Sequence, residues 1–210
     1  ELGYFVTGAF LDRGVINTKF ATDCQTWMVL AFGAERLDAR MKEKFGVENA
    51  SVSVLKKALE LAGVEKDGEY IGVDFYDRAS IVSVEWSSGY LMAVREALRF
   101  SSDPALESSS RSIKEYIASL KTDGVLLPYS DSEVFAETGH GWILIPGMSS
   151  LASTAWNIFE STGIEISPFD IIGERGETRT NVLEGTPVSA HGAAQTSTSA
   201  QASPASSLAT

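Results

Sequence analysis

The sequence predicts a mainly α-helical fold, and three observations support this prediction. Apolar residues recur at intervals of three and four along several stretches, as they do on the buried side of an amphipathic helix. Helix-start signals precede these stretches, and the clearest is Asp103 followed by Pro104 in the first helical position. Strand signals are few and short, confined to residues 1–10, 125–129 and 142–145.

Five helical stretches follow from these patterns. Thr22 or Asp23 can cap the first stretch, and Ser51 can start the second. Each stretch keeps a buried apolar stripe, and several end at a glycine, which readily adopts the conformation that closes a helix. The expected stretches are 22–45 before Gly46, 51–62 before Gly63, 80–100, one from Pro104 that stops before Gly124, and one from Ser149 or Ser150 to Gly163.

A repeat emerges when the helices are compared by composition. Trp27, Trp86 and Trp156 each lie among small and polar residues near the start of an expected helix, at intervals of 59 and 70 residues. More charged, amphipathic stretches at 51–63 and 103–121 alternate with them. This alternation predicts an inner row of helices packed on several sides, with the Trp rings in the core, and an outer row with one wet face. Repeats of this length are typical of stacked helical hairpins.

Composition narrows the classes of partner. The formal net charge is −11, from 28 acidic and 17 basic residues, which argues against nucleic acid and against anionic lipid as partners. No apolar run reaches the roughly 18–20 residues of a membrane span, so membrane insertion is not expected. One cysteine and two histidines leave little for a disulfide or a metal site. We therefore expect no metal and no cofactor.

The chain divides into a folded part and a tail. Residues 187–210 contain no Asp, Glu, Lys or Arg and consist mostly of Ala, Ser, Thr and Gln. Such a segment cannot bury enough apolar surface to offset its ordering entropy. We expect a folded body over residues 1–172 and a disordered, low-complexity tail over 173–210.

The pattern resembles the six-hairpin (α/α)6 toroid of many carbohydrate-active enzymes. The stretches that carry the resemblance are residues 20–27, 74–78 with 84–89, 137–142 and 150–159, the last followed by Ser167-Pro168-Phe169. The resemblance covers roughly residues 5–170. It implies that the chain is the C-terminal part of a twelve-helix ring, and that the N-terminal half of the same domain, upstream of Glu1, is its partner.

Candidate catalytic residues follow from the chemistry of glycosidic cleavage, which needs two carboxyl groups, one of them protonated. The resemblance implies that loops leading into the inner helices line the substrate site. Glu85, beside Trp86 at an inner helix start, is the first candidate, and Asp23, ahead of Trp27, is the second. Their alternative roles are structural: Glu85 can simply favour the helix dipole, and Asp23 can be an N-cap.

Other acids and aromatic residues of these loops are candidates for substrate binding, because aromatic rings stack on sugars and acids bind hydroxyls. Structural alternatives apply here too: Asp77 can pair with Arg78, a lone histidine is often a structural residue, and Trp86 can belong to the core. The expected substrate-binding residues are Trp86, Asp74, Tyr76, Asp77, Tyr129, Glu137, His140 and Trp142.

Together these observations predict a glycoside hydrolase acting on an oligo- or polysaccharide. A non-catalytic carbohydrate-binding or interaction domain is the alternative, and a sugar isomerase or lyase with a His140 base ranks third. A catalytic role for Cys24 is not expected, since no histidine partner is evident. Polysaccharide substrates favour an exported protein, so we expect a secreted or periplasmic location.

Overall fold

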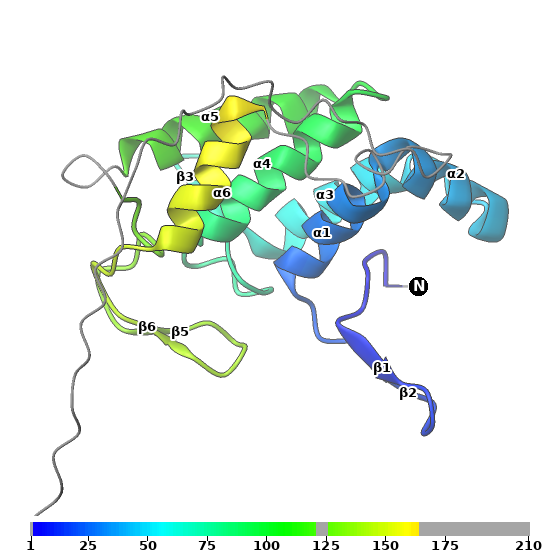
Figure 1. Cartoon of the computed structure of the whole chain (residues 1–210), viewed down its shortest axis with the longest axis horizontal. Helices are drawn as coiled ribbons and strands as arrows, with labels where there is room; N and C mark the ends of the chain where they lie inside the picture. The colour runs from blue at the N-terminus through cyan, green and yellow to red at the C-terminus, as the bar shows by residue number, and fades with distance from the viewer. Residues whose placement is uncertain (1, 121–125, 164–210) are drawn as a thin grey trace, which may run out of the picture. The chain divides into compact units, whose positions relative to one another are not determined.

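The structure, a computed structural model, describes residues 2–120 and 126–163, and this part of the chain is mainly α-helical (Figure 1). Within it lie the helices α1 (Thr22–Phe32), α2 (Ala34–Phe45), α3 (Ala50–Ala62), α4 (Val84–Leu98), α5 (Pro104–Ser119) and α6 (Leu151–Thr162). Antiparallel pairs join β1 (Gly8–Phe10) to β2 (Val15–Asn17), β3 (Gly63–Lys66) to β4 (Glu69–Val73), and β5 (Ala136–Glu137) to β6 (Ile143–Leu144). The expected tail and the expected end of the body at residue 172 lie outside the described residues.

Helix α4 is at the centre of the packing. The other two Trp-bearing helices, α1 and α6, pack against it, and so do α3 and α5 (Figure 1). A Cβ added at Gly89 would lie 3.7 Å from the Trp156 ring and 4.0 Å from the Thr26 hydroxyl, which marks the close approach of α6 and α1. Leu91 and Val94 are buried in the core. A fully buried aliphatic side chain contributes about 1.5–3 kcal/mol, so packing on several sides holds α4 in place.

Two helix starts form as the sequence predicts. At α5, the Asp103 carboxylate accepts hydrogen bonds from the amides of Ala105 (3.1 Å) and Leu106 (3.0 Å). At α6, the Ser150 hydroxyl accepts a hydrogen bond from the Ser153 amide at 3.0 Å. Each such cap stabilises its helix by about 1 kcal/mol.

The start of α1 differs from the prediction. Its N-cap is Ala21, and neither Thr22 nor Asp23 caps the helix. The Thr22 hydroxyl instead donates to the Asp74 carbonyl oxygen at 2.6 Å, which ties α1 to the segment after β4. The expected continuation to residue 45 is also interrupted, because Gly33 has a φ of 75° and separates α1 from α2.

Helix α4 begins later than the predicted residue 80. The amides of Ser80 and Ile81 donate to the Asp74 carboxylate, at 2.9 and 3.2 Å, and so hold a loop conformation. The helix starts after Ser83, whose hydroxyl accepts a hydrogen bond from the Trp86 amide at 3.3 Å.

The β3–β4 hairpin was not predicted. Its turn is Asp67-Gly68, where both residues have positive φ angles, 55° and 83°. Asp-Gly is a preferred pair for a two-residue hairpin turn of this kind. The hairpin ends directly before Asp74, the first residue of the loop that precedes α4.

The prediction that all three Trp rings lie in the core is wrong for Trp27. Its side chain is 47% exposed, whereas Trp86 is buried. Trp27 lies face to face with Trp156, with ring centroids 6.4 Å apart and planes 7° apart. The two rings therefore shield each other at the surface between α1 and α6.

Candidate functional site

The two candidate catalytic carboxyl groups interact electrostatically. Asp23 lies in the first turn of α1, Glu85 lies in the first turn of α4, and both side chains are half-buried. Burial raises the pKa of Glu85 above its ordinary value, and the nearby charge of Asp23 raises it further. The packing of α1 against α4 thus brings together two acids that are 62 residues apart in the sequence.

An aromatic cluster lies beside Glu85, with His140 at its centre. The His140 ring centroid is 5.3 Å from that of Trp86, 5.6 Å from that of Trp142 and 6.3 Å from that of Tyr76. Phe75 is fully buried and contacts the Trp86 ring at 4.8 Å and the Trp142 ring at 6.4 Å. We call these five residues the His140 cluster.

Tyr129 links this cluster to the acids. Its ring stacks on Phe75 with centroids 5.9 Å apart. Burial raises the pKa of Tyr129, the charge of Glu85 raises it further, and a hydrogen bond with the Trp142 side chain acts in the opposite direction. Tyr129 is therefore a neutral phenol that contacts the aromatic cluster and lies near enough to the Glu85 carboxyl group for their charges to interact.

His140 has a defined hydrogen-bond partner. Its Nε2 lies 3.2 Å from the Phe75 carbonyl oxygen. Because a carbonyl oxygen can only accept, Nε2 must carry the hydrogen of this bond. This assigns the tautomer of the neutral ring and leaves Nδ1 as the nitrogen that can accept a proton or a hydrogen bond.

The Asp74 side chain lies beneath the loop that joins β4 to α4. It is fully buried, and its carboxylate accepts hydrogen bonds from the amides of Phe75 (2.7 Å), Ser80 (2.9 Å) and Ile81 (3.2 Å). The Arg78 guanidinium lies 3.4 Å from the same carboxylate. In this arrangement Asp74 shapes the loop that carries Phe75 and Tyr76.

Asp77 and Glu137 are placed differently from the other candidates. Both side chains are exposed, Asp77 in the loop after Asp74 and Glu137 in β5. Within the described residues, no hydrogen bond or ring contact joins either side chain to the His140 cluster. The structure thus brings together Glu85, Asp23 and Tyr129 with the aromatic cluster, and leaves these two acids at its periphery.

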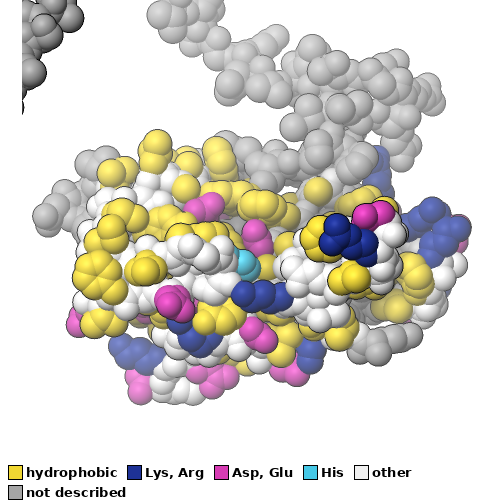
Figure 2. Space-filling model, turned by 90° about the horizontal axis from the view of Figure 1, so that it is seen from below, with side chains coloured by type: hydrophobic (Ala, Val, Ile, Leu, Met, Phe, Trp, Pro, Cys, Tyr) yellow, Lys and Arg dark blue, Asp and Glu magenta, His cyan; other side chains and the backbone are white. Residues whose placement is uncertain are grey.

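Residues that were not predicted complete the site. The Tyr76 ring has two cations over it, the Arg78 guanidinium at 5.1 Å and the Lys19 ammonium at 5.8 Å from its centroid. Lys19 also donates a hydrogen bond to the Gly139 carbonyl oxygen. Lys19 is 120 residues from Gly139, and no local pattern signals such a contact. Figure 2 views the molecule from this side and shows hydrophobic, acidic and basic side chains around the imidazole.

Asp131 fixes the long loop between α5 and α6. Its carboxylate accepts hydrogen bonds from the Val82 amide at 2.9 Å and from the Tyr116 hydroxyl at 3.0 Å. Burial and the Asp131 charge raise the pKa of Tyr116 to about 12. These bonds hold the loop that carries Tyr129, His140 and Trp142 against the start of α4.

The Cys24 thiol lies half-buried in α1. Burial, with a smaller effect of Asp23, raises the pKa of the Cys24 thiol to about 11, so the nucleophilic thiolate is scarce at neutral pH. Among residues 2–120 and 126–163, no group of three or more His, Cys, Asp and Glu side chains is placed to hold a metal ion. No helix in this part of the chain is both long and apolar enough to cross a bilayer.

Comparison of the chain with protein-family models, with curated proteins and with solved structures finds no match.

Proposed function

We propose that this chain belongs to a carbohydrate-active enzyme that hydrolyses glycosidic bonds with a carboxyl pair. Glu85 is the general acid or base, and Asp23 is the second carboxyl group. The observation that carries the proposal is the placement of Glu85, half-buried in the first turn of α4 beside Trp86, where burial and the charge of Asp23 raise its pKa. A carboxyl group that keeps its proton to higher pH can protonate the oxygen of a leaving sugar.

The effect of Asp23 on Glu85 is compatible with different roles for the two acids. Hydrolysis of a glycoside needs one carboxyl group that holds a proton and one that stays charged, as nucleophile or as base for water. The charge of Asp23 is itself one cause of the raised pKa of Glu85. Glu85 thus suits the protonated role, and Asp23 suits the charged role.

The aromatic residues beside the acids suit sugar binding. Trp142 is 41% exposed, so its ring can present a face to the apolar side of a sugar, whereas the Lys19 and Arg78 cations lie over the Tyr76 ring. His140 adds a polar group between the two rings, since its Nδ1 remains available for a hydroxyl. An oligosaccharide that stacks on the Trp142 ring would lie close to Glu85.

The helix packing is compatible with the (α/α)6 toroid that we propose for the fold. The Trp-bearing helices α1, α4 and α6 would be inner helices, and α3 and α5 would be outer helices. Asp23 and Glu85 lie in the first turns of α1 and α4, and the His140 cluster comes from α4 and from the loops that lead into α4 and α6, a placement compatible with a toroid active site. Action on polysaccharides would place the protein outside the cytoplasm, secreted or periplasmic.

The test compares wild-type protein with Glu85→Gln across a panel of aryl glycosides and polysaccharides. Glu35 is the matched control, because it also lies in the first turn of a helix, α2. We expect Glu85→Gln to lower turnover by about 10²–10⁴-fold while oligosaccharide binding persists, and Glu35→Gln to have no effect. Undiminished turnover by Glu85→Gln would overturn the assignment.

The same experiment distinguishes a hydrolase from the alternative, a carbohydrate-binding domain without catalysis. In that case the wild-type protein would bind an oligosaccharide from the panel and would hydrolyse none of them. Replacement of Trp142 by Ala would then abolish binding, because stacking would carry the affinity without help from the acids.

A further inference from the structure

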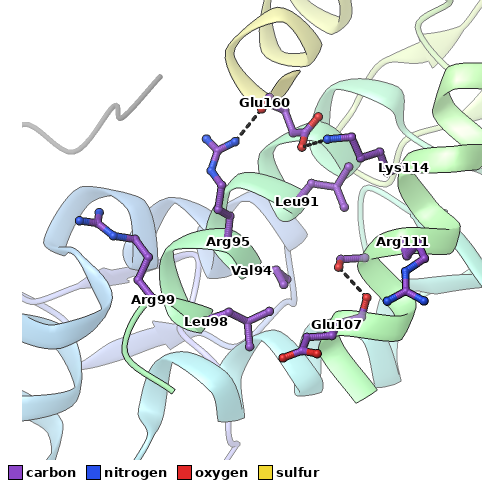
Figure 3. Close-up of a pocket in the computed structure, with 10 residues that line it drawn as sticks. Leu91, Val94, Arg95, Leu98, Arg99, Glu107, Arg111, Lys114 and Glu160 are labelled. Atoms are coloured by element: carbon purple, nitrogen blue, oxygen red, sulfur yellow. Dashed lines mark hydrogen bonds and ion pairs between the residues drawn. The ribbon is translucent and has the colours of Figure 1, made fainter. Parts of the chain in front are cut away.

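A second candidate binding site lies between α4, α5 and α6, where the described residues line a cavity of about 500 Å³ (Figure 3). It is formed by the half of α4 from Leu91 onward, whereas Glu85 lies in the first turn of that helix. Nine residues separate Glu85 from Val94, which corresponds to about 13 Å along a helix. The cavity is thus separate from the candidate active site.

The rim of this cavity is basic. It carries four cationic side chains, Arg95 from α4, Arg99 just after α4, and Arg111 and Lys114 from α5, against the two acids Glu107 and Glu160. Arg99 is also paired with Glu96 at 2.8 Å. This excess of positive charge stands out in a chain with a formal net charge of −11. A local cluster of this kind attracts anions although the protein as a whole repels them.

The floor of the cavity is apolar. Leu98 is half-buried and provides the accessible part of this floor, whereas Leu91 and Val94, 4% and 1% exposed, lie beneath it as part of the core. Figure 3 shows these three side chains along one wall, with α5 opposite. An apolar floor under a basic rim fits a ligand with an apolar body and an anionic head.

Part of the rim is fixed by α6. The Lys114 ammonium lies 2.9 Å from the buried Glu160 carboxylate, and Arg95 donates a hydrogen bond to the Glu160 carbonyl oxygen at 2.6 Å. Figure 3 shows both bonds at the same end of the cavity. They join α4, α5 and α6 at this end of the cavity.

We propose that this cavity binds a small organic anion, a molecule with an alkyl or aromatic body and a single oxyanion head. The body lies on Leu98, above the buried Leu91 and Val94, and the head is bound at the rim by Arg111. The planar guanidinium of arginine binds the oxygens of a carboxylate, sulfonate or phosphate in pairs. A volume of about 500 Å³ is in the ordinary range for small-molecule sites.

Four probes test this proposal by titration calorimetry on the whole chain. Decanoate and 8-anilinonaphthalene-1-sulfonate contain both body and head, decanol contains only the body, and inorganic phosphate only the head. We expect the first two to bind with a stoichiometry of one, and the last two to bind at least about tenfold more weakly. Affinity for decanoate should fall as salt is added, because the head group is bound by charge.

Two variants locate the site. Arg111→Gln should weaken decanoate binding by about tenfold or more, since it removes a charge-assisted hydrogen bond. Arg40→Gln is the matched control: Arg40 is an exposed arginine on α2, paired with Glu43 at 2.8 Å, and its loss should leave binding unchanged. Ser110→Phe places a ring in the cavity and should abolish binding.

The proposal fails if decanoate shows no saturable binding, or if decanol binds as well as decanoate. It also fails if Arg111→Gln and Arg40→Gln have the same effect, because binding would then reflect general surface charge. Circular dichroism and the urea midpoint check that each variant is folded. If Ser110→Phe does not fold, the comparison of the two arginine variants still decides the question.

Discussion

Replacement of Asp74 by Ala should destabilise the protein strongly, because its buried carboxylate holds the loop that precedes α4. The change removes the acceptor of three backbone amides, those of Phe75, Ser80 and Ile81. Phe75 and Ile81 are buried, whereas Ser80 is exposed and can bind water instead. Two buried amides without an acceptor cost about 1–3 kcal/mol each, so we expect a loss of about 4 kcal/mol.

Asp77 provides the matched control, since it is an exposed aspartate three residues along the same loop. Its replacement by Ala should change the free energy of unfolding by less than about 0.5 kcal/mol. Urea denaturation followed by circular dichroism measures both values. A loss below about 1 kcal/mol for Asp74→Ala, or equal losses for the two variants, would refute the role given to the Asp74 carboxylate.

Three further predictions follow from the site. The pKa of folded Glu85 is raised above its ordinary value of 4.5, so the fold binds this proton more tightly than the unfolded chain does, and ionisation above pH 4.5 costs stability. Glu85→Gln should therefore have a higher Tm than the wild type at pH 7 and a similar Tm at pH 4; an equal difference at both pH values would contradict this cause. Gly139→Ala should lower sugar affinity and Tm, because its φ is +74° and a Cβ there would lie 2.5 Å from the Tyr76 ring. Gly141 also has a positive φ, +98°, but a Cβ there would have no atom within 4 Å, so equal effects of the two changes would argue against the clash. Cys24, with a pKa of about 11, should react slowly with iodoacetamide at pH 8 and faster as the pH approaches 11, whereas a plateau near pH 9 would show an ordinary thiol.

The sequence predicted the helix ends that depend on local chemistry. The caps Asp103 and Ser150 bind backbone amides only two or three residues further along the chain. Both the cap and its partner are therefore visible in a short stretch of sequence. The start of α4 could not be predicted in this way. It depends on Asp74, whose carboxylate accepts hydrogen bonds from the amides of Ser80 and Ile81, six and seven residues further along the loop.

The β3–β4 hairpin was predictable in principle. Asp67-Gly68 is a strong hairpin signal and is flanked by Val64 on one side and Tyr70 and Ile71 on the other. Gly63 was interpreted as the end of a helix, which is true, but it is also the first residue of β3. One residue can thus end one element and begin the next.

The candidate site was predicted as a list of residue types, and the structure supplies the contacts between them. The proximity of Asp23 to Glu85 depends on the packing of α1 against α4, which only the tertiary structure defines. Acid and aromatic composition indicated the loops that matter. Composition could not separate Glu85, half-buried beside the aromatic cluster, from Asp74, buried as the acceptor of its own loop.

The most direct test of the account is a titration of the Glu85 side-chain carboxyl group by carbon-detected NMR, in the wild type and in Asp23→Asn. The central claim is that these two acids share one partly buried site. The account predicts a Glu85 pKa above 4.5 in the wild type and a lower value, still raised by burial, in Asp23→Asn. A wild-type pKa at or below 4.5, or a value that does not change in Asp23→Asn, would contradict the claim.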